Sequence, residues 1–279
     1  MDFVKMHGLG NDFICLDHFL LHDPMDYSEI AVRACHRRFG IGADGLLVIL
    51  ASDKADARMR IFNPDGSEPE MCGNGIRCFA RYVYDRGYVK KKAMTIETLA
   101  GILSVNLEIS EEEVVGVTVN MGEPCLVPGL IPVLAEKENA LNEKLIAEGQ
   151  EFLFSAVSMG NPHCVIIVDD LDALLFESLG PAIEKHPLFP KKTNVEFVRI
   201  DNPQEITVKV WERGAGPTLA CGTGACACVV AAVSAGKTQR NVTVHLPGGD
   251  LEIAWNKDNT VDMTGPAVYV FEGKTLENR

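Results

Sequence analysis

The sequence predicts an α/β protein of the α+β type, built from two pseudo-symmetric domains in which a mostly antiparallel sheet wraps around a central helix. Three observations carry this prediction. Segments of strand character outnumber helical ones, one Cys-Gly-x-Gly turn occurs twice, and each copy of the turn opens a helix. The first copy is MCGNGIRC at residues 71–78, and the second is ACGTGACAC at residues 220–228.

The two turns mark an internal repeat. An offset of 149 residues places Cys72 on Cys221, and further matches follow in the same order. They pair Phe62 with Trp211, Gly73 with Gly222, Gly75 with Gly224 and Gly87 with Gly236. An offset of 150 places the Gly-Asn dipeptide at 10–11 on the one at 160–161. We therefore expect a duplication that produced two similarly folded domains.

The elements of the first half follow from apolar periodicity and turn residues. Strands are predicted at 3–8, 12–17, 46–50, 57–63, 93–98, 101–109 and 114–122. Helices are predicted at 28–38 and at 73–87, where Gly87 ends the second helix. That helix carries Arg77, Arg81, Asp85 and Arg86 on one flank, so we expect it to be only partly enclosed. Arg77 is expected to be solvated or structural.

The second half repeats this order. Strands are predicted at 151–159, 164–170, 194–200, 205–213, 241–247, 250–256, 260–265 and 267–273. The helix at 222–236 has almost no polar residue on any side, which predicts a buried helix running through the middle of a curled sheet. The Pro- and Gly-containing stretch 123–140 is predicted to connect the halves.

Composition excludes several classes of partner. The net charge of −13 is spread along the 279 residues, and no basic cluster exceeds the three lysines at 90–92. Nucleic acid and anionic membranes are therefore not expected as partners. The start has no apolar run of the signal-peptide type, and nowhere do 18 uncharged apolar residues follow one another. We expect a soluble cytoplasmic protein that binds a small molecule.

The nine cysteines predict neither a disulfide framework nor a metal site. Their number is odd and their spacing irregular, and the clusters at 72–78 and 221–228 lack the C-x₂-C spacing of zinc sites. The cysteines other than Cys72 and Cys221 are assigned to packing. A G-x-G-x-x-G match at 40–45 follows a helical segment and precedes a strand-like one, which is the reverse of a dinucleotide fingerprint.

Cys72 and Cys221 stand where a helix acts on a thiol. Unpaired N–H groups and the positive end of the helix dipole lower a thiol pKa from about 8.5 towards 7. Glycines let a ligand approach the backbone, so the amides of Gly73 and Asn74, and of Gly222 and Thr223, predict an anion site at each helix start. The alternative is that both cysteines merely pack beside tight turns.

Two such half-sites suit a reaction at one carbon atom. A carboxylate held by both sets of amides would place its α-carbon between the two sulfur atoms. One thiolate could then remove the α-proton while the other thiol delivers a proton to the opposite face. This chemistry is racemisation or epimerisation by two bases, and it requires no cofactor.

The chain resembles the diaminopimelate epimerase family over essentially its whole length. The matching motifs are KMHGLGNDF, GIGADGLL, NPDGSEPEMCGNGIRC, MGNPHCV, TNVEFV and WERGAGPTLACGTGACA, in this order. The resemblance implies an isomerase that converts L,L- to meso-diaminopimelate without pyridoxal phosphate, in lysine and peptidoglycan precursor biosynthesis. It also implies the diaminopimelate epimerase-like fold, with domains at 1–120 plus 266–279 and at 121–265, and an active site in the cleft between them.

The resemblance assigns roles to individual residues. The two bases fall on Cys72 and Cys221, and His163 and Glu212 become candidates for changing the protonation state of the thiols. Substrate contacts fall on Asn11, Asp44, Asn63, Gly73, Asn74, Asn161, Asn194, Glu212, Arg213, Gly222 and Thr223. Arg213 can hold a distal carboxylate in a bidentate fork, and Glu212 can face an ammonium group. Some family members carry glutamine at the position of Asp44, so a contact there stays open. A homodimer is one assembly to consider, and the sequence does not decide it.

Simpler explanations exist for several of these residues. Asn11 and Asn161 each follow a glycine and could serve turns. His163 could be a structural histidine, and the charged residues of Trp-Glu-Arg-Gly at 211–214 could be a surface pair before a turn.

Other functions also remain open. A proline racemase or hydroxyproline epimerase uses paired cysteines, but it needs no clamp for a second carboxylate such as Arg213. A thiol redox protein would need a resolving cysteine nearby and would bind no amino acid. A non-catalytic binding module of the same fold would lack one of the two thiols, and this chain has both.

Overall fold

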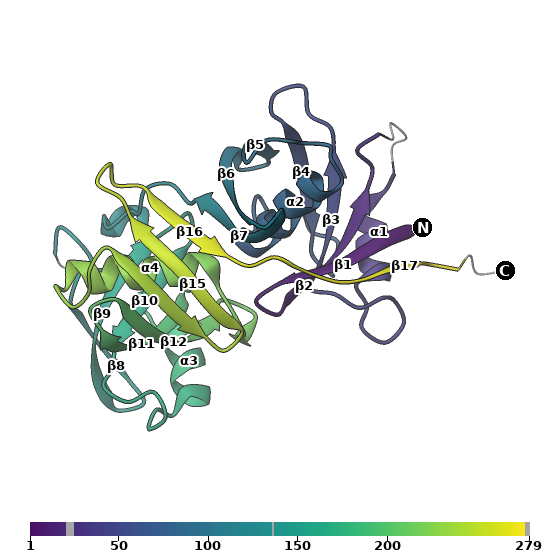
Figure 1. The fold of residues 1–279 in the computed structure, drawn as a ribbon. Coiled ribbons are helices and arrows are strands. Elements are labelled where there is room, and N and C mark those ends of the chain that lie inside the picture. The colour runs from purple at the N-terminus through teal and green to yellow at the C-terminus, as the bar shows by residue number, and fades with distance from the viewer. Residues whose placement is uncertain (21–24, 136, 277–279) are drawn as a thin grey trace. The chain divides into compact units, whose positions relative to one another are not determined.

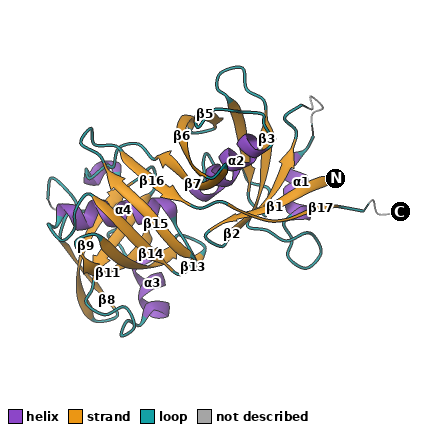
Figure 2. Cartoon of the chain, in the orientation of Figure 1, coloured by secondary structure: helices purple, strands orange, loops and turns teal. Residues whose placement is uncertain are grey.

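The computed structural model describes residues 1–20, 25–135 and 137–276. The chain divides into two compact units. Unit 1 comprises Met1–Asn120 and Thr264–Arg279, and unit 2 comprises Met121–Met263. Strands outnumber helices in both units (Figure 2). Within the described ranges, no helix combines the length and the apolar character that a membrane crossing needs.

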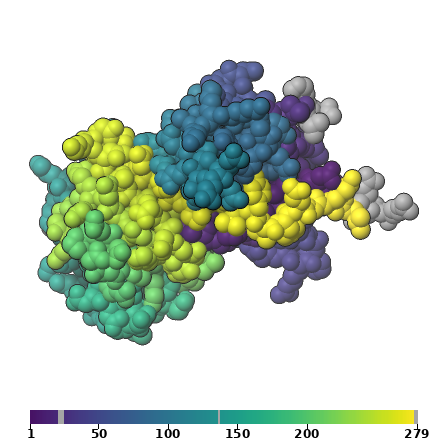
Figure 3. Space-filling view, in the orientation of Figure 1, coloured from purple at the N-terminus to yellow at the C-terminus, as the bar shows by residue number. Residues whose placement is uncertain are grey.

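Unit 1 is a sheet built around one helix. Its strands are β1 (Asp2–Gly8), β2 (Asn11–Asp17), β3 (Gly45–Leu50), β4 (Ala57–Phe62), β5 (Ala93–Thr98), β6 (Gly101–Ser110), β7 (Glu113–Asn120) and β17 (Val268–Lys274). They pair in the order β17-β1-β2-β3-β4-β5-β6-β7, and only β2–β3 and β4–β5 are parallel. Helix α2 (Gly73–Asp85) packs against β1, β2, β3, β4, β6 and β7, while α1 (Tyr27–Ala34) covers β3 and β4. Because β17 pairs with β1, C-terminal atoms border N-terminal ones on the surface of unit 1 (Figure 3).

Unit 2 repeats this plan. Its strands are β8 (Glu143–Ala147), β9 (Gln150–Ser158), β10 (Pro162–Ile167), β11 (Asn194–Asn202), β12 (Glu205–Glu212), β13 (Gly216–Thr218), β14 (Asn241–Leu246), β15 (Gly249–Trp255) and β16 (Val261–Gly265), the last of which leads back into unit 1. The order is β8-β9-β10-β11-β12-β14-β15, and again only two pairs, β10–β11 and β12–β14, are parallel. Helix α4 (Gly222–Ser234) packs among β9, β10, β11, β12, β14 and β15 (Figure 1), and α3 (Phe176–Glu184) packs on β8, β11 and β12.

The central helices are equivalent in detail. Both α2 and α4 have 13 residues, both follow a cysteine N-cap, and both end just before a glycine with positive φ, 74° at Gly87 and 69° at Gly236. Glycine adopts this left-handed conformation without a steric penalty, so it stops each helix. The predicted fold, a mostly antiparallel sheet around a central helix in each half, is confirmed.

The expectation that the first central helix is only partly enclosed is wrong at Arg77. This side chain is completely buried, because its guanidinium group donates to the carbonyl oxygens of Gly73 and Pro266 and to Asn74 Oδ1. Asp85 and Arg86, at the end of the helix, are exposed as expected. The helix is therefore buried as far as Val83 and is exposed only at its C-terminal end.

Three other predictions need correction. The stretch 123–140 is no free connection, because Ile131, Val133 and Ala140 are buried in the core of unit 2 and a 3₁₀ turn (Pro128–Leu130) lies within it. The first helix ends at Ala34 instead of residue 38. Helix α3 was not predicted, and neither were the short strands β8 and β13. Pro181 inside α3 and the lack of a side-chain N-cap remove the usual helix signals.

Candidate functional site

The starts of α2 and α4 present their cysteines on the same backbone geometry. Cys72 has φ −142° and ψ 119°, and Cys221 has φ −121° and ψ 110°, both extended N-cap conformations. An extended cap leaves the first N–H groups of a helix without partners inside the helix. In unit 1 one of them, the N–H of Gly75, donates to Cys72 Sγ at 3.4 Å. Each turn therefore presents helix-start amides, and the binding of an anion by Gly73, Asn74, Gly222 and Thr223 stays a prediction.

A chain of hydrogen bonds surrounds Cys72 in unit 1. Arg77 donates to Asn74 Oδ1 at 2.9 Å, Asn74 Nδ2 donates to Asn11 Oδ1 at 3.1 Å, and Asn11 Nδ2 donates to Asp44 Oδ2 at 2.9 Å. Arginine can only donate and a carboxylate can only accept, so both asparagine amides have a single orientation. Asn11 Oδ1 also accepts from the Cys72 thiol at 3.8 Å. Four predicted residues thus meet here.

The far end of this chain is held by cations. Arg37 bridges Asp12 and Asp44 at 2.8 and 2.6 Å, and Lys5 Nζ lies 2.6 Å from Asp12 Oδ2. Burial by itself raises the pKa of Asp12, but the hydrogen bonds from Arg37 and Lys5 outweigh it and hold the pKa well below its usual range. Both carboxylate oxygens of Asp44 are therefore engaged within unit 1, one by Arg37 and the other by Asn11 and the Asp12 amide.

Asn63 lies apart from this chain of bonds. It follows β4, and its side chain donates to Ser67 Oγ at 2.9 Å in a turn that the Asn63 N–H closes on the carbonyl oxygen of Ser67. The contacts of Asn63 are therefore those of a turn residue, and its predicted contact with substrate stays a prediction.

A second chain of hydrogen bonds leads to Cys221 in unit 2. Glu196 Oε1 lies 2.7 Å from His163 Nδ1, and His163 Nε2 lies 3.0 Å from Asn161 Oδ1. Asn161 Nδ2 then donates to Thr223 Oγ1 at 3.3 Å, and Thr223 Oγ1 lies 3.6 Å from Cys221 Sγ. Three predicted residues therefore connect Cys221 to a carboxyl group that the sequence reasoning missed.

Strand register explains why these side chains meet. In the parallel pair β10–β11, His163 lies opposite Asn194, so both point to one face, and Glu196 follows two residues later on that face. Glu196 lies opposite Val210 of β12, which puts Glu212, two residues beyond Val210, on the same face. Helix α4 covers this face, because Gly224 of α4 lies against Glu196. The sequence signal that could have identified Glu196 is its position two residues after Asn194, because residues i and i+2 of a strand lie on the same face.

Asn194 and Arg213 form a separate contact. The side chain of Asn194 is buried, donates to the carbonyl oxygen of Pro162 at 2.8 Å, and accepts from the backbone N–H of Arg213 at 2.9 Å. The Arg213 side chain is exposed, and one of its N–H groups reaches the carbonyl oxygen of Lys191 at 3.5 Å. Asn194 therefore fixes the backbone from which the guanidinium group extends.

The expectation of a lowered thiol pKa is wrong for Cys221. Burial, with 6% of the residue exposed, raises the pKa of this thiol well above its ordinary value, and the carboxylate of Glu212 raises it further. Hydrogen bonds from Thr223 and the Gly224 amide act in the opposite direction without outweighing burial. Cys221 is therefore a thiol at neutral pH, because desolvation exceeds the effect of the helix terminus.

The other cysteines behave as packing residues. Six of them are buried and Cys125 is half-buried, and burial raises the pKa of Cys35 to about 11 and that of Cys78 to about 12. The residues covered by the structure contain no cluster of three histidine, cysteine or carboxylate side chains suited to a metal ion.

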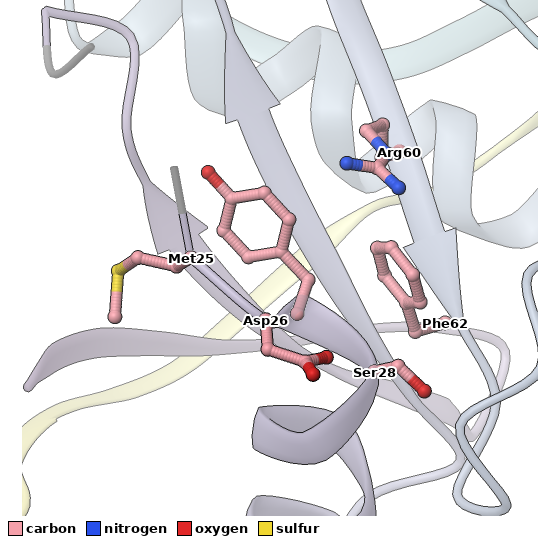
Figure 4. A pocket seen from close by; sticks show the side chains of 6 residues that line it. Met25, Asp26, Ser28, Arg60 and Phe62 are labelled. Atoms are coloured by element: carbon pink, nitrogen blue, oxygen red, sulfur yellow. The ribbon is translucent and has the colours of Figure 1, made fainter. Parts of the chain in front are cut away.

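A surface hollow of roughly 460 Å³ lies elsewhere on unit 1 (Figure 4). It is lined by Met25, Asp26, Tyr27, Ser28, Arg60 and Phe62. Among its described lining residues the basic one is Arg60, which makes two 2.8 Å bonds to Glu68 and lies 4.8 Å from the centre of the Phe62 ring. The predicted site residues do not line this hollow, and its cation is already paired.

Comparison with known proteins identifies the family. The model of the diaminopimelate epimerase family matches residues 3–127 and 155–270. The chain belongs to the diaminopimelate epimerase family. It is 63% identical to diaminopimelate epimerase of Desulfitobacterium hafniense over 100% of this chain and 99% of that one. It is 54% identical to diaminopimelate epimerase of Moorella thermoacetica over 98% of both chains.

Solved structures share the diaminopimelate epimerase-like fold at low identity. A phenazine biosynthesis protein of the PhzF family from Bacillus anthracis has a TM-score of 0.71 at 19% identity over 99% of both chains. A hydroxyproline epimerase from Agrobacterium vitis, solved with trans-4-hydroxy-L-proline, also has a TM-score of 0.71, at 16% identity over 98% of this chain and 91% of that one. These likenesses show the fold alone, so they give no support to hydroxyproline as the substrate.

Proposed function

We propose that the chain is an isomerase that epimerises L,L-diaminopimelate to meso-diaminopimelate with two thiols and no cofactor. The observation that carries this proposal is the pair of cysteine N-caps, Cys72 and Cys221, at equivalent places on equivalent central helices. The family and the names of its closely similar relatives support diaminopimelate as the substrate. We also propose that this reaction serves lysine and peptidoglycan precursor biosynthesis. The enzyme is proposed to act in the cytoplasm and as a homodimer.

The proposed reaction needs both predicted domains, at 1–120 plus 266–279 and at 121–265, because each supplies one thiol. Backbone amides at both helix starts bind the carboxylate of the reacting centre. They are the amides of Gly73 and Asn74 in one domain and of Gly222 and Thr223 in the other. One sulfur, as the thiolate, takes the α-proton, and the C–H bond breaks. The other thiol gives its proton to the opposite face of the same carbon, so the negative charge passes from one sulfur to the other.

The surroundings of Cys221 support a role as proton donor in the free enzyme. Burial and the carboxylate of Glu212 raise the pKa of the Cys221 thiol, which suits Cys221 to the delivery of a proton. Cys72 is then the base that removes the α-proton. His163 and Glu212 help Cys221 to exchange its proton between turnovers. The chain of bonds from His163 to Thr223 supports this role for His163.

Recognition of the second amino acid centre is assigned to polar side chains. Arg213 binds the distal carboxylate through two parallel N–H bonds, and its exposed side chain on a backbone held by Asn194 supports this role. Asn11, Asn63, Asn161 and Asn194 provide further donors and acceptors, and Glu212 faces an ammonium group. Asp44 acts through Asn11, because Arg37, Asn11 and the Asp12 amide already engage its oxygens.

The proposal is tested by α-proton exchange in deuterated buffer without any added cofactor. Diaminopimelate, proline and glutamate are incubated separately with the enzyme, and deuterium incorporation and stereoisomer composition are measured. We expect diaminopimelate alone to exchange and to epimerise. Turnover of proline without turnover of diaminopimelate would show a proline racemase instead. Thiol-disulfide turnover without exchange of any amino acid would show a redox protein.

A further inference from the structure

Glu196 occupies the place that a leucine has in the other half of the molecule. A Cβ atom added to Gly75 of α2 would lie 3.1 Å from Leu47, and one added to the equivalent Gly224 of α4 would lie 2.7 Å from Glu196 Oε1. Strand pairing agrees, since Leu47 lies opposite Ile61 and Glu196 opposite Val210, each pair 149 residues from its counterpart. The fold therefore accepts an apolar side chain at this place.

His163 likewise stands where unit 1 has an aromatic residue. Phe13 lies opposite Gly45 in the parallel pair β2–β3, and His163 lies opposite Asn194 in the parallel pair β10–β11. Phe13 is 2% exposed and His163 is completely buried. Unit 1 thus fills with phenylalanine and leucine the space in which unit 2 buries a histidine and a carboxyl group.

Burying His163 and Glu196 is unfavourable if the Glu196 carboxyl group is left as an anion without hydrogen-bond partners for both oxygens. Glu196 and His163 both have 0% exposure, and Glu196 Oε2 has no hydrogen-bond partner among the residues that the structure covers. A buried carboxylate with a bare oxygen is far less stable than a neutral carboxyl group. Burial correspondingly raises the pKa of Glu196, although His163 opposes the shift. Unit 1 packs apolar side chains at the same places, so the fold does not require polar ones there. Buried polar residues that the fold does not require are typical of a functional site.

The hydrogen-bond directions decide where the protons lie. Asn161 Nδ2 donates to Thr223, so its Oδ1 accepts, and the proton between Asn161 and His163 belongs to Nε2. In the neutral ring, Nδ1 is then an acceptor. With the ring neutral, the 2.7 Å contact between Nδ1 and Glu196 Oε1 requires the proton to be on Glu196, as an O–H group.

We propose that Glu196 is a positioning residue for Cys221, which rests on the proposed function. The protonated carboxyl group of Glu196 donates to His163 Nδ1 and so keeps the ring proton on Nε2. The Nε2–H group holds Asn161 Oδ1, which directs the Asn161 amide group to Thr223 Oγ1 beside the thiol. In this arrangement the pair of side chains carries no net charge, so it adds none next to Cys221.

Two substitutions of the same residue test this arrangement. Glu196→Gln keeps the shape of the neutral carboxyl group and can donate an N–H bond to Nδ1, so we expect kcat within about threefold of the parent enzyme. Glu196→Leu copies Leu47 and removes the donor, so we expect kcat to fall by at least about tenfold, with a smaller change in KM. Equal losses in both variants, or full activity in Glu196→Leu, would overturn the proposal.

Two further measurements separate positioning from folding. Nitrogen NMR of the parent enzyme and of Glu196→Gln should show His163 protonated at Nε2 and unprotonated at Nδ1, and a proton on Nδ1 in the parent enzyme would contradict the proposal. The double variant His163→Phe with Glu196→Leu copies the apolar pair of unit 1 and should unfold at a urea concentration at least equal to that of the parent. A lower unfolding midpoint would show that the pair serves stability.

The failure of the underlying function would be recognised separately. If the parent enzyme does not exchange the α-proton of diaminopimelate, the proposed function fails, and the protonation of His163 still tests the role of Glu196. If the parent enzyme exchanges this proton and Glu196→Leu does so equally fast, only the role of Glu196 fails.

Discussion

Around Cys72 the completely buried ionisable side chain of the central helix is Arg77, whereas around Cys221 a neighbouring strand buries Glu196 completely. The equivalent of Arg77 in unit 2 is Cys226, and the equivalent of Glu196 in unit 1 is Leu47. The duplicated backbone therefore presents two cysteines in the same way, while the buried side chains behind them differ. The comparison teaches that backbone symmetry places the two thiols, and that each thiol is surrounded by different side chains.

The hydrogen bond beside each cysteine also runs in opposite directions. In unit 1 Asn74, on the helix, donates to Asn11 on the turn, and in unit 2 Asn161, on the turn, donates to the helix residue Thr223. The acceptor atom of Asn11 consequently faces Cys72, whereas a hydroxyl group faces Cys221. Because a hydroxyl group can donate or accept, Thr223 can follow a change in protonation of the neighbouring sulfur, and the Asn11 oxygen cannot.

The largest effect is expected from removing either thiol. Cys72→Ala and Cys221→Ala should each lower the epimerisation rate by about 10³-fold or more, since each removes one of the two proton-transfer groups. Cys78→Ala and Cys228→Ala, in the same two helices, are matched controls that should keep the rate within a few-fold, because both residues only pack. Steady-state kinetics with diaminopimelate measures this, and a large asymmetry between Cys72→Ala and Cys221→Ala would contradict equal need for both halves.

Replacing the buried Arg77 should lower the free energy of unfolding more than replacing Cys226, its equivalent in unit 2. Arg77→Leu removes a buried cation that donates to acceptors on Gly73, Asn74 and Pro266, so we expect the free energy of unfolding to fall by at least about 3 kcal/mol. Cys226→Ala, at the equivalent place of α4, should lower it by only about 1 kcal/mol. Urea unfolding followed by circular dichroism compares the two, and similar losses would remove the distinction between the units.

A substitution in the proposed substrate clamp should lower activity less than the loss of a catalytic thiol. Arg213→Lys replaces a planar two-point donor by a single ammonium group, so we expect kcat/KM to fall by about 10–100-fold, mainly through KM. Arg240→Lys is a matched control in unit 2, because Arg240 stacks on Trp255, with 4.3 Å between its guanidinium carbon and the ring centre. An Arg213→Lys enzyme with unchanged kcat/KM would show that the distal carboxylate is bound elsewhere.

The smallest effect concerns the pH dependence of stability, which should have opposite signs in the two units. The lowered pKa of Asp12 gives stability that is present above its unfolded value of 3.8 and is lost as pH falls. The raised pKa of Glu196 gives stability that is present below its unfolded value of 4.5 and is lost as pH rises through the folded value. Each group can change the free energy of unfolding by at most about 1.4 kcal/mol per pH unit.

Unfolding of the parent, Asp12→Asn and Glu196→Gln proteins between about pH 3 and pH 7 checks these signs. Asp12→Asn should lose part of the stability gain between acid and neutral pH, and Glu196→Gln should lose part of the decline above pH 4.5. Both tryptophans, Trp211 and Trp255, lie in unit 2, so their fluorescence follows that unit separately. Identical pH profiles for all three proteins would contradict the electrostatic comparison.

Repetition made most of the fold predictable from sequence. The matched glycines and the apolar helix at 222–236 indicated two sheets around central helices, because helix ends and all-round burial depend on local composition. The burial of Arg77 depends on Pro266, 189 residues away in the chain, so local patterns showed only a polar flank. Helix α3 was missed for a local reason, since Pro181 contradicts the usual helix pattern.

The candidate site was predictable to the extent that its residues belong to turns and helix caps. The glycines beside Cys72 and Cys221 and the two Gly-Asn turns can be recognised in the sequence. Glu196 lies within a strand of ordinary composition, and only its contact with His163 indicates a role in the site. The pKa of Cys221 was mispredicted because helix termini are visible in sequence, while desolvation and carboxyl groups from other strands are not. Pairwise register across β10, β11 and β12 supplied the missing information.

The most direct test of the account is the stereochemical position of deuterium during the first turnovers in deuterated buffer. If two thiols act on opposite faces of one carbon, the face that loses its proton differs from the face that receives one from solvent. We therefore predict that, starting from L,L-diaminopimelate, early deuterium appears in the meso product while the remaining L,L substrate stays unlabelled. Deuterium accumulating in the L,L substrate as fast as in the product would contradict the two-thiol account, because a single base would then serve both faces.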